Sequence, residues 1–225
     1  MPSKKLKKNT KVDNKKHEAF LPLLVLTFLL WVFYRAIFHF PVWFDESIGK
    51  LVFFALPVIL YVSISGNSKI FTTFSFKKFK PGLLLGLAIG GVFGFAGALL
   101  GALSRGGEVT ILPHYLANWF WWEMFLAVMT GFWETLFFFS FVMIIVEEKF
   151  HYFSLFKQVG LVALIFLLFH LPNIFIQFGS AEILLQIVLI LAFACGQALI
   201  FHKRRNAYLL MLTQAIWGMV LLIHF

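Results

Sequence analysis

Two ionisable side chains, Glu134 and His170, are predicted to lie in the middle of long apolar segments. Glu134 is followed four residues later by Phe138, so no basic residue lies one turn away on the same helix. An ionisable group at bilayer depth costs from about 3 kcal/mol upward and is therefore a candidate functional site. Glu134 must be protonated, contact water or pair with another segment, and His170 is the best candidate partner. The two could activate water as a general base, or form an interhelical hydrogen bond with no chemistry.

The composition explains why these residues are expected inside a membrane. Of 225 residues, 61% are hydrophobic and only 13% are charged, and the mean hydropathy is +0.90. Soluble domains carry about a quarter charged residues, so an ordinary cytosolic enzyme is excluded and an integral membrane protein is expected. The net charge of +9 does not indicate nucleic acid binding, because so apolar a chain has no soluble surface for a phosphate-binding face. Cys195 is the one cysteine, which excludes an internal disulfide and a cysteine-based metal site.

The predicted fold is all-α, a polytopic transmembrane helical bundle of about seven spans. A spanning helix needs roughly 20 mostly apolar residues. The segments that qualify, with boundaries uncertain by several residues, are 20–40, 49–65, 82–103, 118–146, 158–177, 182–201 and 206–224. The fourth segment is too long for one straight span and too short for two, so it is expected to tilt or to project from the bilayer.

The basic residues predict the orientation of this bundle. Short cytoplasmic loops are rich in Lys and Arg. With the N-terminus inside and the C-terminus outside, all but three of the 19 Lys and Arg residues fall on the cytoplasmic side, and the exceptions are Arg35, Lys50 and Arg105. Residues 1–19 contain seven lysines and are expected to form a disordered basic cytoplasmic tail that contacts membrane lipids.

Glycines in the third span predict a close helix contact. They recur at positions 82, 86, 90 and 94, and again at 97 and 101, along one helix face. This spacing of small residues lets a neighbouring backbone approach closely, and we expect the neighbour to belong to the same chain.

The spacing of Glu134 and His170 resembles that of the CPBP family, the CAAX-protease and bacteriocin-processing membrane proteins. The first family motif, Glu-Glu-x-x-x-Arg, keeps its second Glu as Glu134 but has Trp133 and Phe138 at the other two positions. The second motif, Phe-x-x-x-His, is present as Phe166 and His170, 36 residues after Glu134. The third, His-x-x-x-Asn or Asp, is replaced.

In this third motif, Gln214 and Gly218 occupy the positions of the His and of the Asn or Asp. The resemblance covers residues 118–225, which would form a CPBP-like four-helix core, and residues 20–117 would form a variable three-span region. It makes this chain a divergent member with degenerate first and third motifs.

The resemblance implies an intramembrane endopeptidase that cuts a lipid-anchored or transmembrane peptide near its membrane anchor. Glu134 and His170 would activate water, or hold a zinc ion if the protein is active, and Gln214 would offer an amide donor to the oxyanion. The replaced motif residues leave an alternative open. A catalytically inactive homologue would use the same helices as a membrane scaffold or partner-binding protein, with Glu134 and His170 as an interhelical lock. The expected location is the plasma membrane of a prokaryotic cell.

Overall fold

The computed structural model describes residues 17–104, 119–177 and 179–224, and within these ranges its regular secondary structure is entirely helical. The predicted all-α class is therefore confirmed. Among these residues, six helices are long and apolar enough to cross a membrane, which is compatible with an integral membrane protein. The last apolar helix is shorter, so the seventh span stays a prediction.

The helices follow one another through short connections. Their bounds are α2 (Phe20–Ile37), α3 (Val42–Phe44), the π-helical turns η1 (Asp45–Gly49) and η2 (Leu51–Ala55), α4 (Leu56–Ser65), the 3-10 turns η3 (Ser68–Phe74) and η4 (Phe76–Lys78), α5 (Phe79–Ser104), α6 (Phe120–Glu134), the π-helix η6 (Thr135–Met143), α7 (Ile144–Lys149), α8 (Leu155–Gln177), α9 (Ser180–Arg204) and α10 (Ala207–His224).

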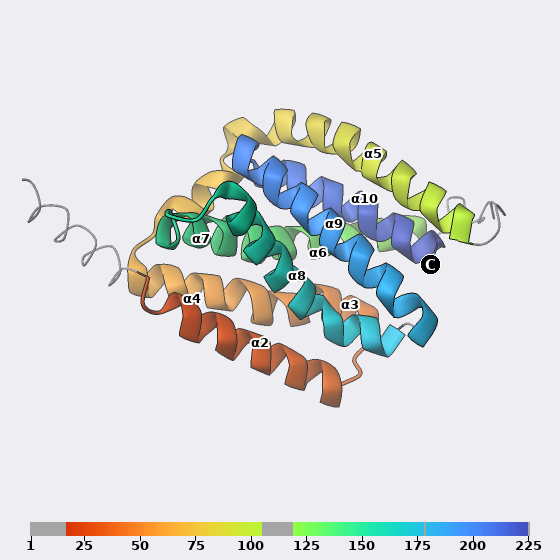
Figure 1. Cartoon of the computed structure of the whole chain (residues 1–225), viewed down its shortest axis with the longest axis horizontal. Coiled ribbons are helices and arrows are strands. Elements are labelled where there is room, and N and C mark those ends of the chain that lie inside the picture. The colour runs from red at the N-terminus through yellow and green to blue at the C-terminus, as the bar shows by residue number, and fades with distance from the viewer. Residues whose placement is uncertain (1–16, 105–118, 178, 225) are drawn as a thin grey trace, which may run out of the picture.

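Helices α6, η6 and α7 form one continuous helix through the middle of the bundle (Figure 1). In that view α2 and α4 lie on one side of it, α5 and α10 lie on the other, and α8 and α9 pass in front. Every residue of η6 is buried, including four phenylalanines that pack with rings of α4, α8 and α9. The predicted long fourth span is thus the central helix. The phenylalanines of its η6 segment are core residues, whereas Phe125 of its α6 segment is 51% exposed.

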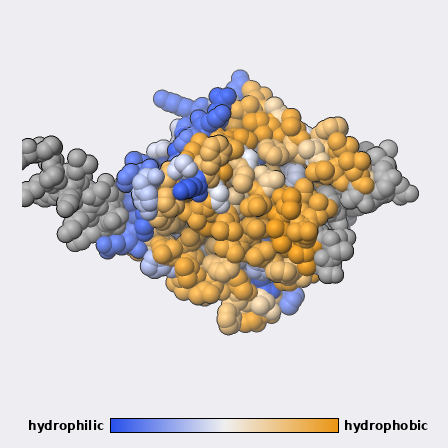
Figure 2. Space-filling model, viewed as in Figure 1, coloured by the Kyte–Doolittle hydropathy of each residue, from blue (hydrophilic) through white to orange (hydrophobic). Residues whose placement is uncertain are grey.

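The outer helices expose apolar side chains. Leucine, isoleucine, valine and phenylalanine side chains are exposed along α2, α4, α5 and α9. Figure 2 shows this hydrophobic surface over most of the visible face, with hydrophilic residues gathered toward the end where the described chain begins. An apolar surface of this extent is unfavourable in water and is expected of a surface that faces lipid.

The predicted glycine contact is an intramolecular contact between α5 and α10. A Cβ atom on Gly86 would lie 2.9 Å from the backbone carbonyl O of Leu209, and one on Gly90 would lie 2.6 Å from the side chain of Ile216. A Cβ atom on Gly91, one residue off this face, would meet nothing within 4 Å. Only the glycines on one face are therefore needed for the approach of α10.

Two predicted boundaries differ from the structure. The second apolar helix begins at Val42, seven residues before the predicted start of the span, because Asp45 and Glu46 are helical and have charged partners that offset their burial.

At the N-terminus, residues 1–16 of the predicted tail lie outside the described residues, whereas His17 is buried and its Nδ1 lies 2.6 Å from the Tyr61 hydroxyl. The described chain therefore joins the bundle before the predicted tail ends.

The described basic loops gather at one end of the bundle. The connections from α4 to α5, from α7 to α8 and from α9 to α10 lie together there (Figure 1). They carry Lys69, Lys77, Lys78 and the run Lys203 to Arg205. The cytoplasmic assignment of this basic end remains a prediction that follows from the positive-inside rule.

Candidate functional site: a buried charged cluster

Glu134 lies at the end of α6 and has polar partners from three other helices. Its Oε1 is 2.7 Å from Nζ of Lys50, and its Oε2 accepts a hydrogen bond of 3.4 Å from Nε2 of Gln214. Nε2 of His170 is 3.6 Å from Oε1, slightly beyond hydrogen-bond distance. The structure thus brings together all three residues singled out in the sequence, and Glu134 itself is only 7% exposed.

The nearest partner of Glu134 is a residue that the sequence reasoning did not select. Lys50 is 4% exposed and also contacts Glu46 at 2.5 Å, one helical turn away. Glu46 in turn accepts a hydrogen bond from the hydroxyl of Thr130. Lys50 is an exception to the distribution of basic residues over the loops, and it falls just inside a predicted span. A basic residue inside an apolar segment must be paired, so these two features of the sequence indicate that Lys50 is a buried charge with an acidic partner.

The spacing of Phe166 and His170 places both rings on one face of α8. The rings stack with centroids 4.1 Å apart and an interplanar angle of 19°. Nδ1 of His170 lies 2.8 Å from the carbonyl O of Phe166, to which it can only donate. In a neutral imidazole this bond leaves the Nε2 lone pair directed toward the cluster, and in the imidazolium both nitrogens carry protons. The Phe-x-x-x-His pattern therefore has a structural role, since it fixes the orientation of the His170 ring whether or not the protein is an enzyme.

Gln214 is oriented by a second hydrogen bond. The Thr135 hydroxyl donates to its Oε1 at 2.6 Å, and this bond directs the amide NH₂ group toward Glu134. The backbone of α10 can come this close because of Gly131, where a Cβ atom would clash with the carbonyl O of Met211. The amide NH₂ group has two N–H donors, and the one contact that it makes here is directed at Glu134, so an oxyanion would share this group with that carboxylate.

The residues present do not fit a zinc ion. Zinc sites in proteins usually have three or four ligands from His, Cys, Asp or Glu. The described residues contain no cluster of three such side chains. Lys50 places an ammonium against the Glu134 oxygen, so this carboxylate already has a cationic partner. The donor set and the local charge both disfavour the metal that the family resemblance implies.

A second charged group lies near the first, on α2 and η1. The buried carboxylate of Asp45 accepts a hydrogen bond of 2.5 Å from the Tyr34 hydroxyl and pairs with Arg35. The indole of Trp31 donates to the carbonyl O of Phe169 at 2.9 Å and thereby links α2 to α8. Two of the three basic residues that depart from the predicted loop pattern, Arg35 and Lys50, therefore neutralise buried acids between helices.

Comparison with known proteins adds no assignment for this site. The chain matches no protein family model, no curated protein and no solved structure.

Proposed function

We propose that this protein is a catalytically inactive, multi-pass membrane protein that acts as a scaffold or binds a partner within the bilayer. In this proposal, Lys50, Glu134, Gln214 and His170 hold four helical segments in a fixed arrangement. The observation that carries the proposal is the direct contact between the Lys50 ammonium and the Glu134 carboxylate at 2.7 Å. A carboxylate in a buried ion pair is held by its partner and is a poor candidate for a free general base.

The energetics of burial support this role. Bringing two charges out of water costs several kcal/mol per ion, and their attraction offsets that cost only when the geometry is good and other hydrogen bonds are made. The cluster meets that condition, because Glu134 also accepts from Gln214 and Lys50 also contacts Glu46. A buried ion pair is weak evidence for added stability, and in this proposal the pair specifies how the helices are arranged.

An intramembrane endopeptidase remains a second candidate, because the side chain of His170 is 20% exposed whereas those of Glu134 and Lys50 are 9% and 5% exposed. As a peptidase, the protein would use His170 with Glu134 to activate water against a lipid-anchored or transmembrane peptide, as the resemblance to the CPBP family implies. This role requires Glu134 to exchange Lys50 for water during the reaction.

The two roles are separated by assaying cleavage and folding on the same samples. Purified wild type, Glu134→Ala and His170→Ala would be incubated with prenylated and transmembrane peptides, and bound zinc would be measured. The scaffold role predicts no cleavage by wild type, no stoichiometric zinc and a lowered unfolding temperature for Glu134→Ala. Cleavage by wild type that is lost in a folded His170→Ala variant would establish the peptidase instead.

We further propose that the protein resides in the plasma membrane of a prokaryotic cell with the basic end in the cytoplasm. The gathering of basic loops at one end supports this orientation. A cysteine introduced at Lys77 should then react with a membrane-impermeant maleimide only after the cells are broken. Labelling of this cysteine in intact cells would show that the basic end faces the outside, which is the opposite of the proposed orientation.

A further inference from the structure

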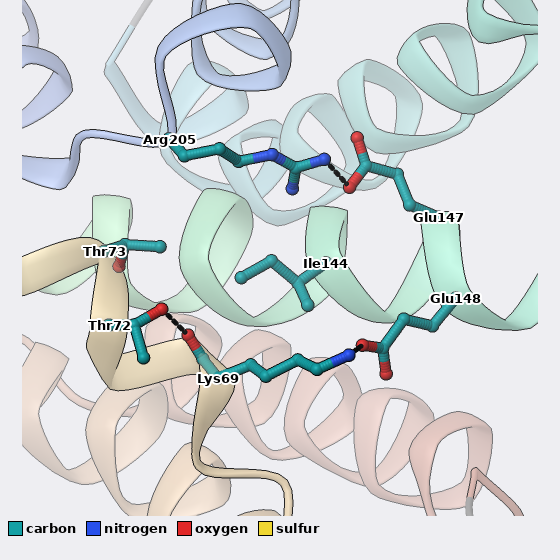
Figure 3. A pocket seen from close by; sticks show the side chains of 7 residues that line it. All are labelled: Lys69, Thr72, Thr73, Ile144, Glu147, Glu148 and Arg205. Carbon is teal, nitrogen blue, oxygen red and sulfur yellow. Dashed lines mark hydrogen bonds and ion pairs between the residues drawn. The ribbon is translucent and has the colours of Figure 1, made fainter.

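A pocket of about 370 Å³ lies at the basic end of the bundle, between η3, α7 and the start of the connection from α9 to α10. Its volume is within the range of small-molecule sites, roughly 300 to 1,000 Å³. Figure 3 shows Lys69 and Arg205 extending past opposite sides of Ile144 toward two acids of α7, Glu147 and Glu148. The pocket therefore has an apolar middle bounded by two separate ion pairs.

The charges in this pocket are balanced, and each acid has more than one partner. Lys69 Nζ is 2.8 Å from Oε1 of Glu148, and Arg205 contacts Glu147. Glu147 also lies 2.7 Å from Nδ1 of His202.

Glu148 likewise accepts from the Asn67 amide at 2.9 Å. Both carboxylates thus keep a partner if Lys69 and Arg205 turn toward a ligand. For Lys69 the exchange costs little, because its side chain is 68% exposed and exposed ion pairs contribute only about 0 to 1 kcal/mol. Arg205 is 38% exposed, and Glu147 keeps His202 as a partner when Arg205 turns away.

This arrangement selects a ligand that carries both signs of charge. A simple anion would meet two carboxylates, and a simple cation would meet Lys69 and Arg205. A phosphate accepts strong hydrogen bonds from Lys and Arg, and a primary ammonium donates to carboxylates. We propose that the pocket binds a phosphoethanolamine group, with its phosphate on Lys69 and Arg205 and its ammonium on Glu147 and Glu148.

The position of the pocket indicates where such a group would come from. Its lining residues come from η3, α7 and the connection from α9 to α10 at the basic end of the bundle, where Phe71 of η3 and Phe76 of η4 expose apolar side chains. Charged side chains beside exposed apolar ones are expected at the level of the lipid headgroups, and a pocket with both signs of charge suits a headgroup that carries both. Phosphatidylethanolamine in the bilayer and free O-phosphoethanolamine in solution share the required chemistry. Binding of either does not depend on the proposed scaffold role, because Glu134 is not part of the pocket.

The test uses the full chain in a nonionic detergent and native mass spectrometry to measure the affinity of short-chain lipids. Phosphatidylethanolamine should bind about fivefold or more tightly than phosphatidylcholine, whose ammonium has no N–H donor, and than phosphatidylglycerol, which has no ammonium. Equal affinities for all three lipids would overturn the proposal.

Two matched variants sharpen this test. Lys69→Gln should weaken phosphatidylethanolamine binding about fivefold, whereas Lys77→Gln, an exposed lysine at the same end that does not line the pocket, should leave it unchanged. Equal weakening by both variants would show only a general attraction to basic residues and would contradict the proposal. Glu147→Gln should reduce the preference for phosphatidylethanolamine over phosphatidylglycerol. An unaltered preference would show that Glu147 does not bind the ammonium group and would contradict the proposal.

Competition with free O-phosphoethanolamine distinguishes the two sources. Displacement of the lipid at similar concentrations supports the site and identifies the soluble compound as sufficient. Much weaker competition also supports the site and shows that acyl chains contribute, so that the bilayer lipid is the ligand.

Discussion

The continuous helix formed by α6, η6 and α7 carries acids in two different environments. Glu134, at the end of α6, is buried and pairs with Lys50 from the α3 to α4 segment. Glu147 and Glu148, on α7, are partly exposed and pair with Arg205, His202 and Lys69 at the basic end. The same ion-pair chemistry thus occurs twice on one helix, once inside the bundle and once at its edge.

Burial decides what each set of charges can do. Removing one member of a buried pair leaves an uncompensated charge, so the inner cluster fixes how the helices are arranged. At the edge, water and salt compete for each pair, and the partners can be exchanged for a ligand at small cost. The inner cluster is therefore suited to holding the helices together, and the outer pairs are suited to binding.

The largest effect is expected from Lys50→Met, which leaves Glu134 and Glu46 without their shared cation. Breaking a buried pair in this way should lower the free energy of unfolding by about 3 to 5 kcal/mol, or abolish folding. Unfolding in mixed micelles, followed by circular dichroism, measures the change. Lys80→Met, at an exposed lysine on α5, is the control and should behave like wild type. A Lys50→Met variant as stable as this control would mean that the inner pair has no special role.

A smaller effect is expected from Gly131→Ala, which tests the close approach that places Gln214 beside Glu134. The added methyl group would meet the backbone carbonyl of Met211, so the helices must separate at a cost of about 1 to 3 kcal/mol. Gly91→Ala adds the same methyl group where nothing lies within 4 Å and should be neutral or slightly stabilising. Equal melting temperatures for the two variants would argue against a tight α6 to α10 contact.

Gln214→Leu should cost less, about 1 to 2 kcal/mol, because it leaves the buried Thr135 hydroxyl without its acceptor while the Lys50 pair is retained. Adding Thr135→Val to this variant removes the unpaired hydroxyl and should restore part of the loss. If the loss of unfolding free energy in the double variant equalled or exceeded the sum of the losses in Gln214→Leu and Thr135→Val, these two side chains would not be hydrogen-bonded to each other.

The smallest effect is expected from Lys69→Gln at the edge, which should change stability by less than about 1 kcal/mol. High salt should remove even this difference, because the Debye length falls to about 3 Å at 1 M. The loss caused by Lys50→Met should persist at the same salt concentration, since the inner pair is buried. If salt changed the stability losses of the two variants equally, the inner and outer ion pairs would not differ in their exposure to solvent.

Sequence alone predicted most of the helices and part of the cluster. Helix positions follow from the length of the apolar segments, which lipid and backbone hydrogen bonding dictate. The pairing of Glu134 with His170 was predicted because polar groups at bilayer depth need partners, and Gln214 was added to the site by the resemblance to the third family motif. Lys50 was not predicted as the main partner, since its pairing with Glu134 joins segments 84 residues apart. Its departure from the loop pattern marks Lys50 as a buried charge, but the identity of its partner depends on tertiary packing.

The helical segment before Lys50 was missed for a related reason. Asp45 and Glu46 are typical of an exposed loop, and their burial becomes favourable only when Arg35, Tyr34 and Lys50 surround them. The π-helical winding of η6, directly after Glu134, likewise has no signal in a run of phenylalanines. The burial of Asp45 and Glu46 arises from contacts between segments rather than from local propensity.

A double-mutant cycle between Lys50 and Glu134 tests most directly whether these residues act as an interhelical lock. It compares the free energies of unfolding of wild type, Lys50→Met, Glu134→Gln and the double variant. A lock predicts a coupling of about 2 kcal/mol or more, with the double variant more stable than Lys50→Met alone. A coupling near zero, with Glu134→Gln as stable as wild type, would contradict the lock and leave Glu134 available for chemistry.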